Sequence, residues 1–126
     1  MLSLIENNMK NEISKTKYFL YARKSSESEE RQVQSIDDQI NSLKILAKDE
    51  GLNVVDILFE SKSAKAPGKR KVFEDMIQRI KAGEADGILC WEINRLSRNP
   101  VDSGTIQWML QEEVIKSIQT IGRVFA

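Results

Sequence analysis

The sequence contains no histidine and a single cysteine, Cys90, among its 126 residues. Without histidine, the chain lacks the commonest general base and the commonest ligand for transition metals. One cysteine can form neither an internal disulfide nor a zinc site. A magnesium site made only of carboxylates remains open, although no motif indicates one. Any catalysis therefore has to depend on Ser, Thr, Tyr, Lys, Arg and carboxylate side chains.

An excess of charge and a long apolar segment are also missing. Nineteen Lys and Arg balance nineteen Asp and Glu, whereas a free-standing DNA-binding module usually carries a basic excess. No apolar run approaches the roughly 20 residues that span a membrane, and no signal sequence is evident. We therefore expect a cytoplasmic protein with no membrane partner, and the length allows one compact domain.

Short apolar runs alternate with amphipathic segments along the chain. Apolar runs predict buried strands at 17–23, 54–59, 87–91 and 115–121. Helical spacing of apolar residues predicts helices at about 31–50, 73–82 and 100–110. Gly51 is placed to end the first helix, and Asn99-Pro100 to begin the third. This order predicts an α/β fold, a small and mostly parallel sheet of about four to five strands with helices on both faces.

The two ends of the chain suggest its domain organisation. Residues 1–16 are polar with scattered apolar positions, which favours a weakly ordered N-terminal tail. Residues 17–126 are expected to form one domain. The sequence ends on the apolar residues Val124-Phe125-Ala126 with nothing after them to cover them. We therefore expect a domain taken from a longer protein.

Arginines follow each of the first three predicted strands. In open α/β sheets, ligands bind beyond the carboxyl ends of the strands, and there the chain places Arg23 with Ser25, then Arg70, then Arg95 and Arg98. A guanidinium binds phosphate bidentately and stays charged, while a serine supplies an attacking hydroxyl. The balanced total charge thus conceals a local positive patch, and the pattern predicts phosphoryl transfer without a metal.

Each of these features also has an ordinary structural interpretation. Loop arginines and serines are usually solvated, and an acidic stretch at 27–30 would repel phosphate or form an exposed turn. Lys62 and Lys65 are expected in a solvated, flexible loop. Cys90 is expected to be buried and inert, and the aromatic residues Tyr18, Phe19, Tyr21, Trp91 and Trp108 are expected to pack in the interior.

Four motifs, in order, resemble the N-terminal catalytic domain of the serine recombinases, the resolvase and invertase family. Residues 21–25, Tyr-Ala-Arg-Lys-Ser, resemble the Tyr-x-Arg-x-Ser signature, and residues 34–39 are similar to the family's helix-opening motif. Arg70 stands where the family has an arginine before its second helix, and residues 94–98 resemble Asp-Arg-Leu-x-Arg. The match spans about 17–125. Residues 67–70 and 98–100 look more like the large serine recombinases, which include site-specific integrases.

The resemblance implies a reaction on double-stranded DNA. Ser25 would attack the scissile phosphate, form a 5′-phosphoserine link and release a 3′ hydroxyl. The strands would rejoin after subunits rotate within a synaptic tetramer assembled from dimers. The family needs no metal or nucleotide cofactor, and its members move phage genomes or mobile elements or rearrange a host locus.

The resemblance also assigns roles to seven further residues. Binding of the phosphate and stabilisation of its transition state would fall to Arg23, Arg70, Arg95 and Arg98. Gln39 would help orient the site, and Tyr21 would support the first strand. Asn94 departs from the family pattern, which often has aspartate there. Because an amide neither accepts a proton nor pairs ionically with arginine, we expect Asn94 to position a neighbouring arginine by a hydrogen bond.

Three interpretations of function remain open. The resemblance favours a recombinase catalytic domain that lacks the family's long interface helix and DNA-binding domains, and such a fragment would bind DNA poorly and recombine nothing alone. Asn94 is the feature that favours a catalytically inactive relative with a regulatory or assembly role. A third interpretation is an unrelated α/β domain that binds or hydrolyses a phosphate-bearing ligand. Against a nucleotide-binding domain, no glycine-rich loop follows the first strand.

Overall fold

The structure is a computed structural model that describes residues 15–25 and 34–125. Its strands are β1 (Lys17–Arg23), β2 (Asn53–Glu60), β3 (Gly87–Cys90), β4 (Ser117–Gln119) and β5 (Val124–Phe125). Its helices are α2 (Ile36–Glu50), α3 (Lys71–Lys81), α4 (Ile93–Leu96) and α5 (Pro100–Gln111). The predicted tail, apart from Lys15 and Thr16, and the acidic stretch at 27–30 lie outside the described residues.

The five strands form one sheet in the order β2-β1-β3-β4-β5. The pairs β1–β2, β1–β3 and β3–β4 are parallel, and β5 runs antiparallel to β4. The predicted small, mostly parallel α/β sheet is therefore confirmed. The fourth strand is shorter than the apolar run at 115–121 suggested, because Ile121 already belongs to the turn that leads into β5.

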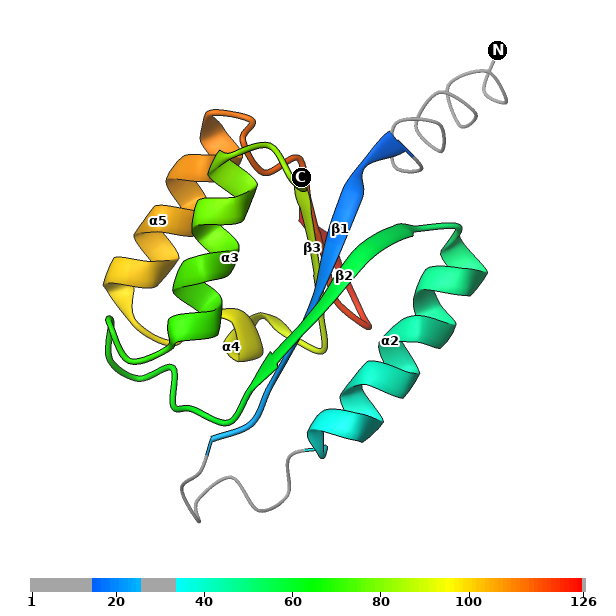
Figure 1. The fold of residues 1–126 in the computed structure, drawn as a ribbon, viewed down its shortest axis with the longest axis horizontal. Coiled ribbons are helices and arrows are strands. Elements are labelled where there is room, and N and C mark those ends of the chain that lie inside the picture. Colours follow the sequence, from blue (N-terminus) through cyan, green and yellow to red (C-terminus); the bar gives the residue numbers. More distant parts are fainter. Residues whose placement is uncertain (1–14, 26–33, 126) are drawn as a thin grey trace.

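Helices cover both faces of the sheet, as predicted (Figure 1). Alternate residues of β1 point to opposite faces, so Tyr18, Leu20 and Ala22 pack with α2 while Phe19 and Tyr21 pack with α3 and α5. The helix residues buried beneath these strands are Leu43 and Ala47 of α2, Phe73, Met76 and Ile80 of α3, and Ile106 and Met109 of α5. Strand β1 is thus buried on both faces, as its apolar run indicated.

Local chemistry sets the helix boundaries. Helix α2 begins at Ile36, because the Ser35 side chain accepts a hydrogen bond from the Asp38 amide at 3.1 Å and caps the helix there. Of the predicted helix start, residues 31–33 lie outside the described residues, and residues 34–35 are not helical. Gly51 ends it with φ of 69°, a left-handed conformation that suits glycine. Asn99 caps α5 in the same way, with Pro100 in the first turn.

Other features differ from the sequence-based expectations. Residues 93–96, expected to be loop, form the one-turn helix α4. Trp108 was expected in the interior, which is wrong, since 60% of its surface is exposed on the outer face of α5. Cys90 is buried, as predicted, and burial raises the pKa of its thiol to about 12. Nothing among the described helices has the length and apolar character needed to cross a membrane.

Strand β1 has close and irregular contacts with its two neighbours. A Cβ atom added to Gly87 would lie 2.7 Å from Thr16 Cγ2 and 2.7 Å from Tyr18 Cδ1, so only glycine lets β3 approach here. On the other side, Tyr18 pairs with Val54 but Phe19 pairs with Asp56, which is a register shift in β2. The first contact fixes the position of β3, the central strand, beside β1.

Candidate active site

The carboxyl ends of β1, β2 and β3 meet at one edge of the sheet, as expected for parallel strands. Arg23 is the last residue of β1 and Glu60 is the last residue of β2. A backbone hydrogen bond of 3.2 Å from Lys24 N to Glu60 O continues the pairing beyond β1. The residues after β3 form α4 and lead into α5. Every candidate residue is carried by this edge or by the segments that leave it.

Arg23 connects all three of these segments. Its guanidinium donates from Nε to Arg95 O at 2.8 Å, from Nη2 to Asn94 O at 2.8 Å and from Nη1 to Lys62 O at 2.9 Å. The residue is fully buried. These charge-assisted bonds to backbone carbonyls fix the end of β1 against α4 and against the loop after β2.

Gln39 fastens the first turn of α2 to the same strand end. Its Nε2 donates to Arg23 O at 2.9 Å and to Gln34 O at 2.9 Å, and its Oε1 accepts from Arg23 N at 3.3 Å. The side chain is fully buried. The Gln39 side chain thus makes the hydrogen bonds to Arg23 N and O that a neighbouring strand would otherwise make.

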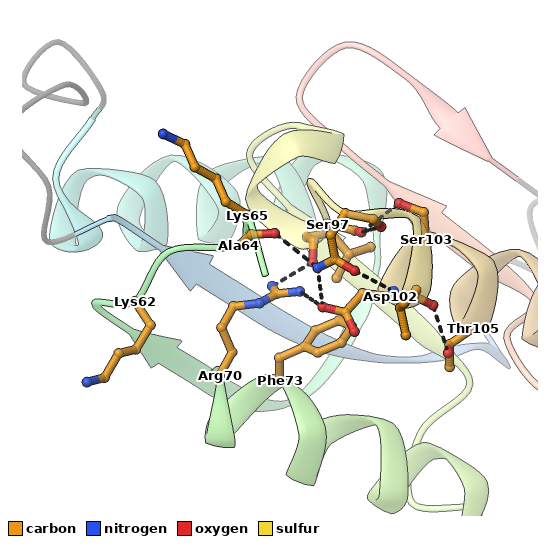
Figure 2. A network of polar contacts seen from close by, with 12 residues as sticks. Lys62, Ala64, Lys65, Arg70, Phe73, Ser97, Asp102, Ser103 and Thr105 are labelled. Atoms are coloured by element: carbon orange, nitrogen blue, oxygen red, sulfur yellow. Dashed lines mark hydrogen bonds and ion pairs between the residues drawn. The ribbon is translucent and has the colours of Figure 1, made fainter. Parts of the chain in front are cut away.

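Arg70 is buried at the start of α3 with only 1% of its surface exposed. Its Nη1 donates to Leu96 O at 2.6 Å and to Tyr21 Oη at 3.2 Å. Its Nη2 donates to Asp102 Oδ2 at 3.0 Å (Figure 2). The guanidinium carbon lies 3.9 Å from the centre of the Phe73 ring, a cation–π contact. Arg70 Nε is buried and has no acceptor among the described residues.

Glu60 is a central residue of the site that the sequence analysis did not identify. Its Oε2 accepts a hydrogen bond from Tyr21 Oη at 2.5 Å, and its carboxylate accepts from the amides of Val72 at 3.2 Å and Phe73 at 3.0 Å. A carboxylate at a helix N-terminus is stabilised by the helix dipole. Burial raises the pKa of Tyr21 far above its ordinary value, although the nearby Arg70 cation opposes the shift. Tyr21 therefore acts as a neutral hydrogen-bond donor.

Asp102 is the second such residue. Besides Arg70, its Oδ2 accepts from Asn99 Nδ2 at 2.7 Å, while Asn99 Oδ1 accepts from Asp102 N at 2.8 Å. Asn99 Nδ2 also donates to Ala64 O at 3.1 Å. Asn99 was predicted to begin this helix, but a helix-start motif cannot show that a carboxylate in the first turn reaches an arginine on another loop. For Glu60, the feature of the sequence that could have indicated a role was an acidic residue at the end of an apolar strand.

Arg95 and Asn94 lie side by side at α4. Arg95 Nε donates to Asn94 Oδ1 at 3.1 Å, and Arg95 Nη1 donates to Arg23 O at 3.4 Å. Arg95 is 2% exposed. The amide oxygen of Asn94 thus accepts the hydrogen bond that an aspartate would accept, without its negative charge.

Ser25 and Arg98 complete the set of candidate residues. Ser25 lies two residues beyond the end of β1 and is 5% exposed. Arg98 lies between α4 and α5 and is exposed. The structure brings Arg23, Arg70 and Arg95 to one edge, but their guanidiniums donate inward to protein acceptors. The predicted positive patch is therefore largely internal here.

No three His, Cys, Asp or Glu side chains gather into a metal-binding cluster within the described part of the chain.

The fold is that of the catalytic domains of serine recombinases. The C-terminal catalytic domain of ISC1926 TnpA, an IS607-like serine recombinase, superposes with a TM-score of 0.66 at 23% identity, over 83% of this chain and 69% of that one. The N-terminal catalytic domain of TP901-1 integrase gives 0.65 at 24% identity, over 84% and 77%. A resolvase family site-specific recombinase from Streptococcus pneumoniae gives 0.65 at 19%, over 85% and 72%.

The sequence itself defines the family. Residues 18–119 match the family model described as "Resolvase, N terminal domain", so the chain belongs to the resolvase family of serine recombinase catalytic domains. The resemblance inferred from the four motifs is confirmed. No curated protein sequence matches the chain significantly.

Proposed function

We propose that the chain is the catalytic domain of a site-specific DNA recombinase and that Ser25 is its nucleophile. The observation that most supports this is the edge at which three buried arginines, Arg23, Arg70 and Arg95, come from three separate segments beside a serine two residues beyond β1. A hydroxyl at the same sheet edge as several cations suits attack on a phosphodiester, whose transition state carries negative charge on its oxygens.

The proposed step conserves the number of phosphodiester bonds. Ser25 Oγ attacks the phosphorus, an Oγ–P bond forms, and the bond from phosphorus to the 3′ oxygen breaks. The serine proton passes to a base or solvent, and the departing 3′ oxygen takes up a proton. Because one phosphodiester replaces another, a 3′ hydroxyl can attack the phosphoserine in the reverse direction and rejoin a strand. No metal or cofactor is needed for this balance.

The arginines have two successive roles in this proposal. In the structure their donors hold the loops together, since Arg23 donates to three backbone carbonyls. We propose that DNA binding rearranges the loops and turns four arginines toward the phosphate, namely Arg23, Arg70, Arg95 and Arg98. The negative charge that develops on the phosphate oxygens then accepts their hydrogen bonds in place of the protein acceptors. The proposed supporting roles of Tyr21, Gln39 and Asn94 are consistent with the hydrogen bonds described above, which hold the arginines or the strand that carries them.

The same proposal implies a DNA partner, an assembly state and a location in the cell. The partner is double-stranded DNA at a specific recombination site, and the active form assembles as a dimer and then a synaptic tetramer in the cytoplasm. The 126-residue chain by itself is expected to bind DNA poorly and to recombine nothing.

The decisive test is recovery of a covalent protein–DNA adduct. The protein at its full natural length is incubated with nicked or mismatched duplexes from the DNA that borders its gene, and detergent-resistant adducts are collected. Mass spectrometry should place a 5′-phosphoryl group on Ser25. Ser25→Ala should abolish the adduct, while Ser42→Ala on α2, outside the candidate site, should retain it. An adduct that persists with Ser25→Ala would eliminate Ser25 as the nucleophile.

The alternative function is an inactive assembly module, to which only Asn94 points and which the family match does not favour. The matched experiment is the substitution Asn94→Asp, which restores the carboxylate common in the family. If Asn94 has made the protein inactive, only the substituted protein should form the adduct on DNA. If the proposal above is right, the protein with Asn94 forms it as well.

A further inference from the structure

We infer that the loop 61–69, between β2 and α3, is a contact surface for the phosphate backbone of double-stranded DNA beside the candidate site. The lysines Lys62, Lys65 and Lys69 would make these contacts. The inference rests on the proposed function for its partner, but it concerns residues to which that function gives no role.

The loop is strongly basic in a chain of zero net charge. Its sequence is Ser-Lys-Ser-Ala-Lys-Ala-Pro-Gly-Lys, with three lysines and no acidic residue in nine positions. All three lysines are exposed. This contrasts with the arginines of the site, of which Arg23 and Arg70 are 0% and 1% exposed. In the described structure, DNA approaching this edge meets the lysines of the loop before it meets those arginines.

The backbone of the loop is anchored, although its composition predicted a flexible segment. Arg23 Nη1 holds Lys62 O at 2.9 Å, and Asn99 Nδ2 holds Ala64 O at 3.1 Å. The Lys65 amide donates to Ser63 Oγ at 3.2 Å, which forms a local turn. After Lys69 the chain enters the interior at Arg70. These contacts fix the positions from which the lysine side chains extend.

The side chains of Lys62 and Lys65 extend away from the site's polar network. Figure 2 shows Lys62 and Lys65 directed away from the contacts of Arg70 and Asp102. The two carboxylates of the site are occupied elsewhere, because Glu60 accepts from Tyr21 and the start of α3 while Asp102 accepts from Arg70 and Asn99. The carboxylates Glu60 and Asp102 are therefore engaged within the network, and the exposed lysines lie on the loop that borders it.

DNA phosphates match this surface in charge. An ammonium is a compact, hydrated point charge on a flexible stem, suited to phosphates whose positions vary along the groove. Such contacts fix register on the duplex without reading sequence. We therefore expect the lysines to contribute to affinity at any duplex that reaches the site, and to place the scissile phosphate over Ser25.

The first test measures the salt dependence of binding. The full-length protein, as Ser25→Ala so that no DNA is cut, is titrated onto a labelled duplex of arbitrary sequence at several salt concentrations. Each lost lysine–phosphate contact should lower the magnitude of the negative slope of log K against log salt by about 0.9. The variant with Lys62, Lys65 and Lys69 all changed to Gln should lower it by about 2.7. Lys44→Gln with Lys48→Gln, on the exposed surface of α2, should leave it unchanged.

The second test is a site-specific crosslink from residue 65. Because Cys90 is buried with a raised pKa, a cysteine introduced by Lys65→Cys can be labelled selectively with a photocrosslinker. It should crosslink to the duplex, while Lys48→Cys, in the last turn of α2, should not. An unchanged salt slope in the triple variant together with no crosslink from residue 65 would overturn the inference. Neither readout requires cleavage, so the loop and the nucleophile are tested separately.

Discussion

Replacing Asp102 by alanine leaves the buried Arg70 guanidinium without the carboxylate that it contacts at 3.0 Å. Because Arg70 is 1% and Asp102 13% exposed, the guanidinium stays buried and water replaces the lost carboxylate only incompletely. Breaking a buried ion pair by removing one side costs about 3–5 kcal/mol. Arg70 keeps its bonds to Leu96 O and Tyr21 Oη, so we expect the lower end, about 3 kcal/mol of unfolding free energy.

Urea unfolding followed by circular dichroism measures this loss. With a denaturant slope of about 1–3 kcal/mol per molar, the midpoint should fall by roughly 1–3 M. A double-mutant cycle with Arg70→Met and Asp102→Leu isolates the pair itself. Removing both partners should cost clearly less than the sum of the two single changes, since neither charge is then left alone.

The chain provides an internal control at the same distance. Arg79 Nη2 lies 3.0 Å from Asp56 Oδ2, but these side chains are 33% and 44% exposed. Exposed pairs contribute about 1 kcal/mol or less, so the cycle with Arg79→Met and Asp56→Leu should give a much smaller coupling. Equal couplings for the two pairs would refute the argument that burial, rather than distance, determines their contribution.

Three further predictions concern the interior. Burial raises the pKa of both Tyr18 and Tyr21, so ultraviolet titration should show no phenolate from them at about pH 10.5 until the chain unfolds. The stability that the neutral phenols contribute is full below about pH 10 and is lost as pH rises above it. Ionisation of these tyrosines in the folded chain at about pH 10.5 would contradict their burial. Cys90, whose pKa is raised to about 12 from 9.0, should react with a thiol reagent at about pH 8 only in denaturant, and rapid reaction of the native chain would disprove this. Gly87→Ala places a methyl 2.7 Å from Thr16 Cγ2 and Tyr18 Cδ1 and should cost about 1–3 kcal/mol in urea unfolding, whereas Gly104→Ala on α5, with no atom within 4 Å, should cost nothing.

Much of the fold could be predicted because its signals are local. The apolar run of β1 and the helical spacing of α3 and α5 depend only on neighbours in the chain. The two-residue strand β5 and the single turn of α4 could not be predicted, because so short a segment shows no periodicity. Trp108 was misplaced because aromatic character alone does not show which side of a helix faces solvent.

The candidate site was predictable in its location but less so in its geometry. The rule that ligands bind beyond parallel strands brought Arg23, Arg70 and Arg95 to one edge. Sequence could not show that their guanidiniums point inward, since that depends on which distant carbonyls and carboxylates lie within reach. Glu60 and Asp102 were missed for the same reason. Their partners, Tyr21 and Arg70, are 39 and 32 residues away along the chain.

The register shift between β1 and β2 has a consequence for how copies of this molecule behave at high concentration. Strand β2 forms one border of the sheet, and a long straight border is a template on which strands of other copies can add and build aggregates. The shift beside Val55 bends that border, and Asp56 adds a charge next to the bend. At the opposite border β5 offers only two residues. We therefore expect strand-by-strand aggregation of the folded molecule to be disfavoured from both sides of the sheet.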